Sequence, residues 1–311
     1  MKYSKNVFKI TNNINTVLTG KSDVVELAVT VLLAQGHLLL EDVPGVGKTT
    51  LANALSKSIG CGFSRIQFTP DTLPGDVTGS SVYNMKTGAF EFLKGAVMSN
   101  IVLADEINRT SPKTQASLLE AMEERQVTVD SVTYQLEQPF MVIATQNPVD
   151  FLGTYNLPEA QLDRFMMKLS IGYPSASEER MMADNFLKGI TKEKLFPVVS
   201  KEEVVQMQEE VKTVNVSAEL NKYIVDMISL TRNNELLVLG ASPRATLALI
   251  RASQAAAYVR NRDYVMPDDV QLTAPYVLSH RLALSTEARL NKATAKEVIE
   301  KIINKVKVPV L

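Results

Sequence analysis

The chain has 311 residues, and its 33 lysines and arginines nearly balance 34 aspartates and glutamates, which leaves a formal net charge of −1. Hydrophobic residues at 45% and charged residues at 22% exclude a disordered chain. The balanced charge argues against a protein whose main affinity is for nucleic acid, so we expect no stable nucleic-acid partner. A single cysteine, Cys61, excludes an intramolecular disulfide.

The N-terminal region carries no apolar segment typical of a secretory signal. The most apolar early stretch, Ala28–Leu40, is interrupted by polar residues and is shorter than the roughly 20 residues that a transmembrane helix needs. We therefore expect a cytoplasmic protein with no membrane span. At roughly 100–200 residues per domain, the length predicts two domains.

The first two thirds of the chain alternate short apolar runs with helical patterns. Runs that are apolar at successive positions indicate strands buried on both faces, as in a parallel sheet covered by helices. The pattern therefore predicts an α/β domain of three layers around a five-stranded parallel sheet. The candidate strands are Leu38–Leu40, Arg65–Phe68, Ile101–Ala104, Phe140–Ala144 and Met167–Ile171.

Two segments interrupt this alternation. Residues 78–100 predict an extended excursion, and residues 126–138 alternate apolar and polar side chains as a hairpin does. After Pro174 strand signals become rare and helical periodicity dominates. We therefore predict an α/β nucleotide-binding domain over residues 1–174 and an all-helical lid domain over residues 175–311.

The residues after the first strand predict a phosphate-binding loop. A strand, a glycine-rich loop that ends in Gly-Lys-Thr and then a helix form the context of a P-loop. Lys48 would reach the β- and γ-phosphates of ATP, and the hydroxyl of Thr49 would bind Mg²⁺. The strict pattern has glycine at position 42, where this chain has Asp42. The predicted nucleotide-binding residues are Pro44, Gly45, Val46, Gly47, Lys48, Thr49 and Thr50.

A pair of acidic residues supports this interpretation. The apolar strand Ile101–Ala104 ends in Asp105 and Glu106. In P-loop proteins an acidic residue at the carboxyl end of a strand holds Mg²⁺, and we assign this role to Asp105. The next carboxylate can orient or deprotonate the attacking water, and we assign this role to Glu106.

With these motifs in place, the chain resembles the MoxR family of AAA+ ATPases over nearly its whole length. The resemblance is specific because several separate blocks occur in the same order. These blocks are Leu40–Thr49, Gln67–Asp71, Asp105–Arg109, Leu119–Glu124, Ala144–Pro148 and Leu157–Phe165.

The resemblance implies roles for three further residues. Asn147 is similar to sensor 1, a polar side chain that helps to position the attacking water beside the γ-phosphate. Arg164 is similar to the arginine finger, which reaches the ATP of a neighbouring subunit; its alternative is a surface salt bridge. Arg244 is similar to the sensor 2 arginine of the lid, which contacts the γ-phosphate, so the resemblance adds Arg244 to the predicted nucleotide-binding residues. The sequence Ser242-Pro243 places it in the first turn of a helix, where the helix dipole favours an anion.

Two other polar residues in the matched blocks remain without a firm role. Arg109 is a candidate for a subunit boundary, and Gln67 is a candidate for linking the nucleotide state to Glu106. The family also has an insertion within its second helix and a hairpin before sensor 1, which correspond to residues 78–100 and 126–138. In ring ATPases such excursions commonly face the pore or the client.

The resemblance implies a Mg²⁺-dependent ATPase that assembles into a homo-oligomeric ring. We expect this ring to be a hexamer. It implies chaperone-like remodelling or maturation of a client protein, or metal-cofactor insertion, often together with a protein that has a von Willebrand factor A domain. Two alternatives stay open: a nucleotide-dependent binding switch with negligible turnover, and a chelatase- or helicase-like motor subunit. The intact Glu106 argues against a pure switch, and the near-zero net charge argues against a DNA motor.

Overall fold

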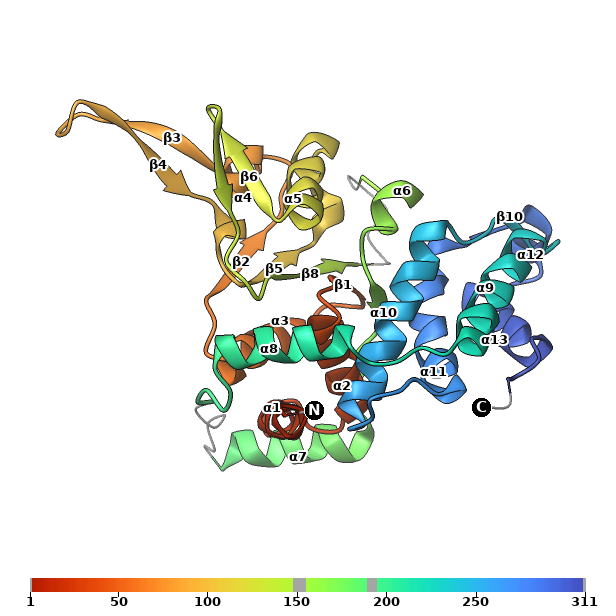
Figure 1. Ribbon diagram of the computed structural model, residues 1–311. Coiled ribbons are helices and arrows are strands. Elements are labelled where there is room, and N and C mark those ends of the chain that lie inside the picture. The colour runs from red at the N-terminus through yellow and green to blue at the C-terminus, as the bar shows by residue number, and fades with distance from the viewer. Residues whose placement is uncertain (1, 148–154, 189–194, 310–311) are drawn as a thin grey trace.

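The computed structural model describes residues 2–147, 155–188 and 195–309, so Pro148 of the fifth matched block lies outside the described residues. Its centre is a five-stranded parallel sheet with the strand order β2-β5-β8-β1-β9 (Figure 1). The predicted parallel sheet is therefore confirmed. Its strands are β1 (Leu38–Glu41), β2 (Phe63–Gln67), β5 (Ile101–Asp105), β8 (Met141–Gln146) and β9 (Met167–Leu169).

Both faces of this sheet are covered by helices, which gives the three predicted layers. Alternate strand residues face opposite sides, so Leu38 and Leu40 pack into one core cluster and Leu39 into another. The first cluster contains the helices α1 (Lys5–Asn15), α2 (Ser22–Leu33) and α3 (Lys48–Ser58). The second contains residues of α4 (Pro74–Thr78) and α5 (Pro112–Glu124).

The two predicted interruptions form antiparallel hairpins that extend from the second face of the sheet (Figure 1). Both hairpins lie on the same side, and the ring of Phe92 stacks on that of Tyr134 at 4.0 Å between centroids. The first hairpin follows α4 and is followed by a short 3-10 helix, η1 (Ala96–Met98). The hairpin strands are β3 (Gly79–Asn84), β4 (Ala89–Lys94), β6 (Gln126–Val129) and β7 (Val132–Gln135).

The C-terminal region is built from helices, with one departure from the expected all-helical pattern. Two short strands, β10 (Leu237–Leu239) and β11 (Ala283–Leu284), pair antiparallel. They are too short to give a readable strand periodicity, so the sequence did not reveal them. The helices are α7 (Ala176–Leu187), α8 (Lys201–Lys212), α9 (Ala218–Arg232), α10 (Pro243–Val259), α11 (Pro267–Leu278), α12 (Thr286–Leu290) and α13 (Ala295–Lys305), with η3 (Ser279–Arg281) and, before β9, α6 (Glu159–Leu162).

The hydrophobic core is continuous between the two halves of the chain. Both α8 and α10 pack against α2, and one core cluster contains residues of α1, α2 and α3 together with residues of α8, α9, α10, α11 and α13. The buried side chain of Gln208 in α8 donates to the carbonyl of Leu32 at 2.8 Å. The division at residues 174 and 175 stays a prediction. In the described parts of the chain no helix has the length and apolar character that crossing a membrane requires.

One buried arginine ties the C-terminal helices to the segment that leads into β9. The guanidinium of Arg281, whose side chain is 2% exposed, pairs with the carboxylate of Asp163 at 2.6 Å. It also donates to the carbonyls of Phe165 at 2.6 Å and Met166 at 3.1 Å. Because a buried charge is stable only when it is fully hydrogen-bonded, this contact fixes the segment that carries Arg164.

The structure also explains why the P-loop motif begins with aspartate. The buried carboxylate of Asp42 follows β1 and accepts hydrogen bonds from the hydroxyl of Ser170 at 3.0 Å and from the backbone N–H groups of Ile171 and Gly172. These residues follow β9, the neighbouring strand. Asp42 therefore satisfies backbone donors that a glycine at this position would leave without an acceptor.

We expect Asp42→Gly, which restores the strict motif, to weaken the fold instead of improving it. Buried N–H groups that lose their acceptor cost about 1–3 kcal/mol of unfolding free energy. Urea unfolding monitored by circular dichroism measures this loss, with Ser170→Ala as a milder control. An Asp42→Gly variant as stable as the wild type would contradict the assignment.

A second buried group, His37, makes stability depend on pH. Its Nε2 lies 3.1 Å from the carbonyl of Met122, and its Nδ1 accepts from the N–H of Val142 at 3.0 Å. Burial lowers the pKa of His37 to about 4, with a smaller contribution from nearby Arg125. The folded chain therefore holds the neutral ring, whereas the unfolded chain binds a proton below about pH 6.5.

The unfolding free energy should therefore fall as pH drops from about 6.5 towards the folded pKa, by up to about 1.4 kcal/mol per pH unit from this one ring. His37→Gln removes the titration, so the variant should lose less stability than the wild type between these pH values. Urea unfolding at about pH 6.5 and near the folded pKa measures how steeply the unfolding free energy of each protein changes with pH. Equal slopes would show that His37 does not titrate as described.

Candidate functional site

The P-loop connects β1 to α3 in the conformation that the motif predicts. Gly45 and Gly47 have φ angles of +86° and +105°, which favour glycine because it has no Cβ. A Cβ on Gly47 would also lie 3.0 Å from the side chain of Leu18. Gly47 is the N-cap of α3, so the loop delivers its backbone N–H groups to the positive end of a helix.

A cavity of about 360 Å³ opens at this loop and brings together groups from the start of α3 and from β2, β5 and β8. Lys48 and Thr49 come from α3, Asp105 ends β5 and Glu106 follows it, and Asn147 follows β8. Parallel strands end at the same edge of the sheet, which is why these side chains meet. Pro44, Gly45, Gly47 and Thr50 also line the cavity, whereas the side chain of Val46 packs against the core.

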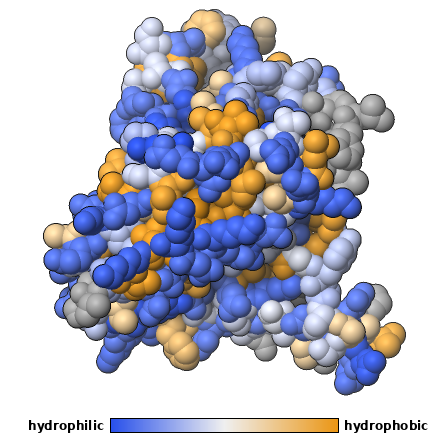
Figure 2. Space-filling view, turned by 90° about the vertical axis from the view of Figure 1, so that its right-hand side faces the viewer, coloured by the Kyte–Doolittle hydropathy of each residue, from blue (hydrophilic) through white to orange (hydrophobic). Residues whose placement is uncertain are grey.

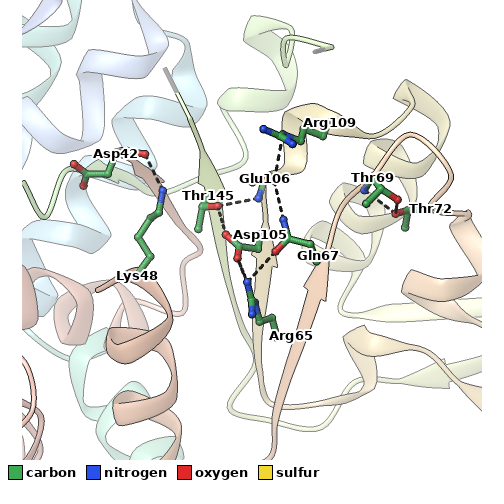
Figure 3. Close-up of polar contacts among 10 residues, drawn as sticks. All are labelled: Asp42, Lys48, Arg65, Gln67, Thr69, Thr72, Asp105, Glu106, Arg109 and Thr145. Carbon is green, nitrogen blue, oxygen red and sulfur yellow. Dashed lines mark hydrogen bonds and ion pairs between the residues drawn. The ribbon is translucent and has the colours of Figure 1, made fainter. Parts of the chain in front are cut away.

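Both oxygens of the Asp105 carboxylate have partners. One accepts from the hydroxyl of Thr145 at 2.7 Å. The other accepts two donors of Arg65 in β2, at 2.6 and 3.2 Å (Figure 3). Charge-assisted hydrogen bonds of this kind hold the side chain in one orientation at the edge of the cavity.

Glu106 has an unusual backbone and a side chain held from two sides. Its φ of +58° is in the left-handed region, and its N–H donates to Thr145 at 2.8 Å. Its carboxylate accepts from the amide of Gln67 at 2.7 Å and pairs with Arg109 at 3.2 Å (Figure 3). Backbone strain that the surroundings stabilise is typical of functional sites. The contact of Gln67 with Glu106 is present as the sequence suggested, and its coupling role stays a prediction.

The two remaining predicted residues, Arg164 and Arg244, lie together in a different cavity of about 270 Å³. Both pair with one carboxylate, that of Glu123 at the end of α5: Arg164 at 3.1 Å and Arg244 in a short contact. Ser242 caps α10 as predicted, and its hydroxyl also donates to Asp163 at 2.9 Å. The structure therefore joins the two arginines to each other and does not bring Arg244 to the P-loop of its own chain.

Comparisons with known proteins agree with this geometry. Residues 37–167 match the ATPase family associated with various cellular activities (AAA), and residues 229–302 match the AAA lid domain. The chain is 40% identical to Chaperone MoxR1 of Mycobacterium tuberculosis over 95% of this chain and 80% of the relative. The chain belongs to the MoxR family of AAA+ ATPases.

Two further proteins are similar to this chain over nearly its whole length. An uncharacterised protein of Bacillus subtilis, YeaC, is 54% identical over 97% of this chain and 94% of its own length. A crystal structure of a Cytophaga hutchinsonii protein, 39% identical, superposes with a TM-score of 0.92 over 99% of this chain and 96% of that one. The protein is thus an ATPase, with the AAA+ fold in both halves.

The cavity at the P-loop fits the nucleotide that a MoxR-family ATPase binds. The ammonium of Lys48 donates to the carbonyl of Asp42 at 2.8 Å, which holds it beside the loop (Figure 3). Backbone N–H groups, an ammonium and a hydroxyl are the donors that phosphate oxygens accept. The residues present therefore match the phosphate end of ATP.

Sequence reasoning missed two residues of this site, Arg65 and Thr145. A signal for Arg65 was present, since it is a charged residue inside a run that otherwise predicts a strand. Its partner could not be read from the sequence, because the pairing of β2 with β5 brings it to Asp105. Thr145 is a polar residue at the end of an apolar run and lies inside a matched block, but its hydrogen bonds join two strands.

We expect Thr145→Val to disturb the site without changing side-chain size. The substitution removes the donor to Asp105 and the acceptor of the Glu106 N–H, both partly or fully buried, at a cost of about 1–3 kcal/mol of unfolding free energy. ATP turnover should fall as well, because both acidic residues lose a positioning contact. Thr145→Ser keeps the hydroxyl and serves as the matched control. Unchanged stability and turnover in Thr145→Val would show that the hydroxyl is dispensable.

Proposed function

We propose that this protein is a Mg²⁺-dependent ATPase of the cytoplasm whose active site is completed by a neighbouring subunit in a hexameric ring. The observation that carries the proposal is the separation of the predicted catalytic groups. Lys48, Asp105 and Glu106 line one cavity, whereas Arg164 and Arg244 line another. A head-to-tail contact between copies would bring the second cavity of one chain to the first cavity of the next.

In this proposal the P-loop side binds the substrate and its metal. Lys48 and the loop N–H groups hold the phosphates of ATP, and the oxygens of Thr49 and Asp105 fit the hard cation Mg²⁺. When bound, Mg²⁺ neutralises phosphate charge during transfer. The described residues contain no cluster of three or more histidine, cysteine or acidic side chains arranged for a metal, which fits an ion held jointly with a nucleotide.

Glu106 and Asn147 act on the attacking water. Glu106 accepts a proton from the water or orients it, while Gln67 and Arg109 hold the carboxylate in place. The amide of Asn147 lines the same cavity and can donate to phosphate while it accepts from water. Both groups lie at strand ends, so the sheet sets their separation.

Arg164 and Arg244 would then reach the γ-phosphate of the neighbouring chain. Both arginines pair with the single carboxylate of Glu123, so neither has an anion of its own. A γ-phosphate beside them would supply a second anion. Leu247, which is 58% exposed, lines their cavity, and arginine beside exposed apolar side chains is typical of interfaces. Figure 2 shows hydrophobic residues gathered at the centre of the face formed by the right-hand side of Figure 1.

Hydrolysis would drive chaperone-like remodelling of a client protein, as the name of the relative Chaperone MoxR1 suggests. The first hairpin offers a surface for such a client, because the side chains of Tyr83, Met85 and Phe90 are largely exposed at its end. Metal-cofactor insertion and a partner with a von Willebrand factor A domain belong to the same proposal. A nucleotide-dependent switch without turnover is the second candidate.

A mixing experiment tests the shared site. Glu106→Gln should bind ATP but hydrolyse it at least about 100-fold more slowly, since it lacks the proton acceptor. Arg164→Ala should lose about 1,000-fold or more, because a missing arginine finger leaves transition-state charge uncompensated. When the two inactive variants are mixed, some sites combine an intact Glu106 with an intact Arg164 from the next chain. The steady-state ATP turnover of the mixture should therefore be well above the sum of the turnover rates of the two variants measured separately.

Lys48→Ala mixed with Glu106→Gln is the matched control. It should show no recovery, because both variants damage the P-loop side of the same cavity. An Arg164→Ala variant with full activity, or a mixture that never recovers, would refute the completion of the site in trans. Client processing that survives in Glu106→Gln while hydrolysis stops would favour the switch.

A further inference from the structure

A third cavity, apart from the one at the P-loop and the one at Arg164 and Arg244, lies between the α/β layers and the C-terminal helices. Its volume is about 360 Å³, and its walls come from α2, α8, α10 and the end of α5. Three cationic side chains line it: Arg125, Lys212 and Arg251. No acidic residue is among the described residues that line it.

Arg125 is held in place more firmly than a surface arginine. It directly follows α5 with a φ of +54°, a left-handed conformation that is uncommon for residues other than glycine. Its side chain is half-buried, and its guanidinium donates to the carbonyl of Gln35 at 3.3 Å. Arg251 lines the same cavity. Burial and the charge of Arg251 lower the pKa of Arg125.

Neither arginine has a carboxylate partner among the described residues. Lys212, by contrast, already pairs with Glu209 at 2.6 Å. Two neighbouring cations without an anion between them repel each other, and the repulsion is stronger where one of them is partly buried. An anion placed between Arg125 and Arg251 would remove this repulsion.

We propose that Arg125 and Arg251 form a binding site for a phosphate group. Each guanidinium offers a planar fork of N–H donors, which matches phosphate oxygens in pairs. The same two arginines also line the adjoining cavity, where the carboxylates of Glu123 and Asp163 are already paired with Arg164, Arg244 and Arg281. The phosphate therefore has two available sources: a free polyphosphate anion, or the nucleotide of a neighbouring subunit.

A phosphate bound here connects two parts of the molecule. Arg125 directly follows α5 of the α/β layers, and Arg251 lies in the middle of α10, whose first turn carries Arg244. The ligand would hold α10 against the sheet side and so favour one position of the C-terminal helices. The free-anion source does not depend on the proposed ATPase mechanism, whereas the neighbour's nucleotide rests on it.

The first arm of the test measures free anion binding in the Lys48→Ala background, which removes the P-loop phosphate site. Isothermal titration with inorganic tripolyphosphate, at a concentration where sizing shows single chains, should reveal saturable binding. Arg251→Ala should weaken it about tenfold or more, since one charge-assisted pair is worth about 1.5–3 kcal/mol. Arg251→Lys should retain part of the affinity. Arg180→Ala, at an exposed arginine of α7, removes the same charge elsewhere and should leave binding unchanged.

The second arm measures assembly of Glu106→Gln with ATP by sedimentation, with and without Arg251→Ala. If the neighbour's nucleotide is the source, Arg251→Ala should raise the concentration at half-assembly about tenfold in ATP and leave it unchanged without ATP. An effect in either arm supports the site and identifies its source. Absence of both effects, or effects equal to those of Arg180→Ala, would overturn it. If Glu106→Gln fails to assemble with ATP, the ring proposal fails and the first arm alone decides.

Discussion

The site depends on one geometric constraint, the common edge at which the parallel strands β1, β5 and β8 end. The register pairs Leu40 with Thr145 and Gln67 with Asp105, so the residues that follow each strand arrive side by side. Thr145 then bonds both to the Asp105 carboxylate and to the Glu106 backbone. A shift of one residue in any strand would turn these groups to the opposite face of the sheet.

Charge is divided between two surfaces of the chain. The P-loop cavity contains both cationic and acidic groups. Arg65 holds the carboxylate of Asp105. Gln67 and Arg109 hold that of Glu106. The second surface, around the cavity that holds Arg164 and Arg244, contains more arginines than carboxylates. Arg281 binds the segment before β9 and so ties Arg164 to the C-terminal helices. Movement of those helices would therefore also move Arg164, which the proposed ring brings to a neighbouring nucleotide.

Much of the fold was accessible from the sequence because buried strands and P-loops have strong local signals. The five apolar runs are the five strands of the sheet, and Ser242 caps α10 as its position indicates. The strands β10 and β11 were missed because two or three residues carry no periodicity. Asp42 looked like a defect in the motif, whereas its carboxylate binds the backbone after β9.

The sequence by itself determined the chemistry at the strand ends: glycines where the loop needs positive φ, a lysine and a hydroxyl at the helix start, and two acidic residues at the end of β5. These are local features, fixed by a few consecutive residues. Only the tertiary structure decided which polar groups meet, because the partners of Asp105, Glu123 and Arg125 come from distant parts of the chain. Long-range packing places those side chains, and no short stretch of sequence encodes it.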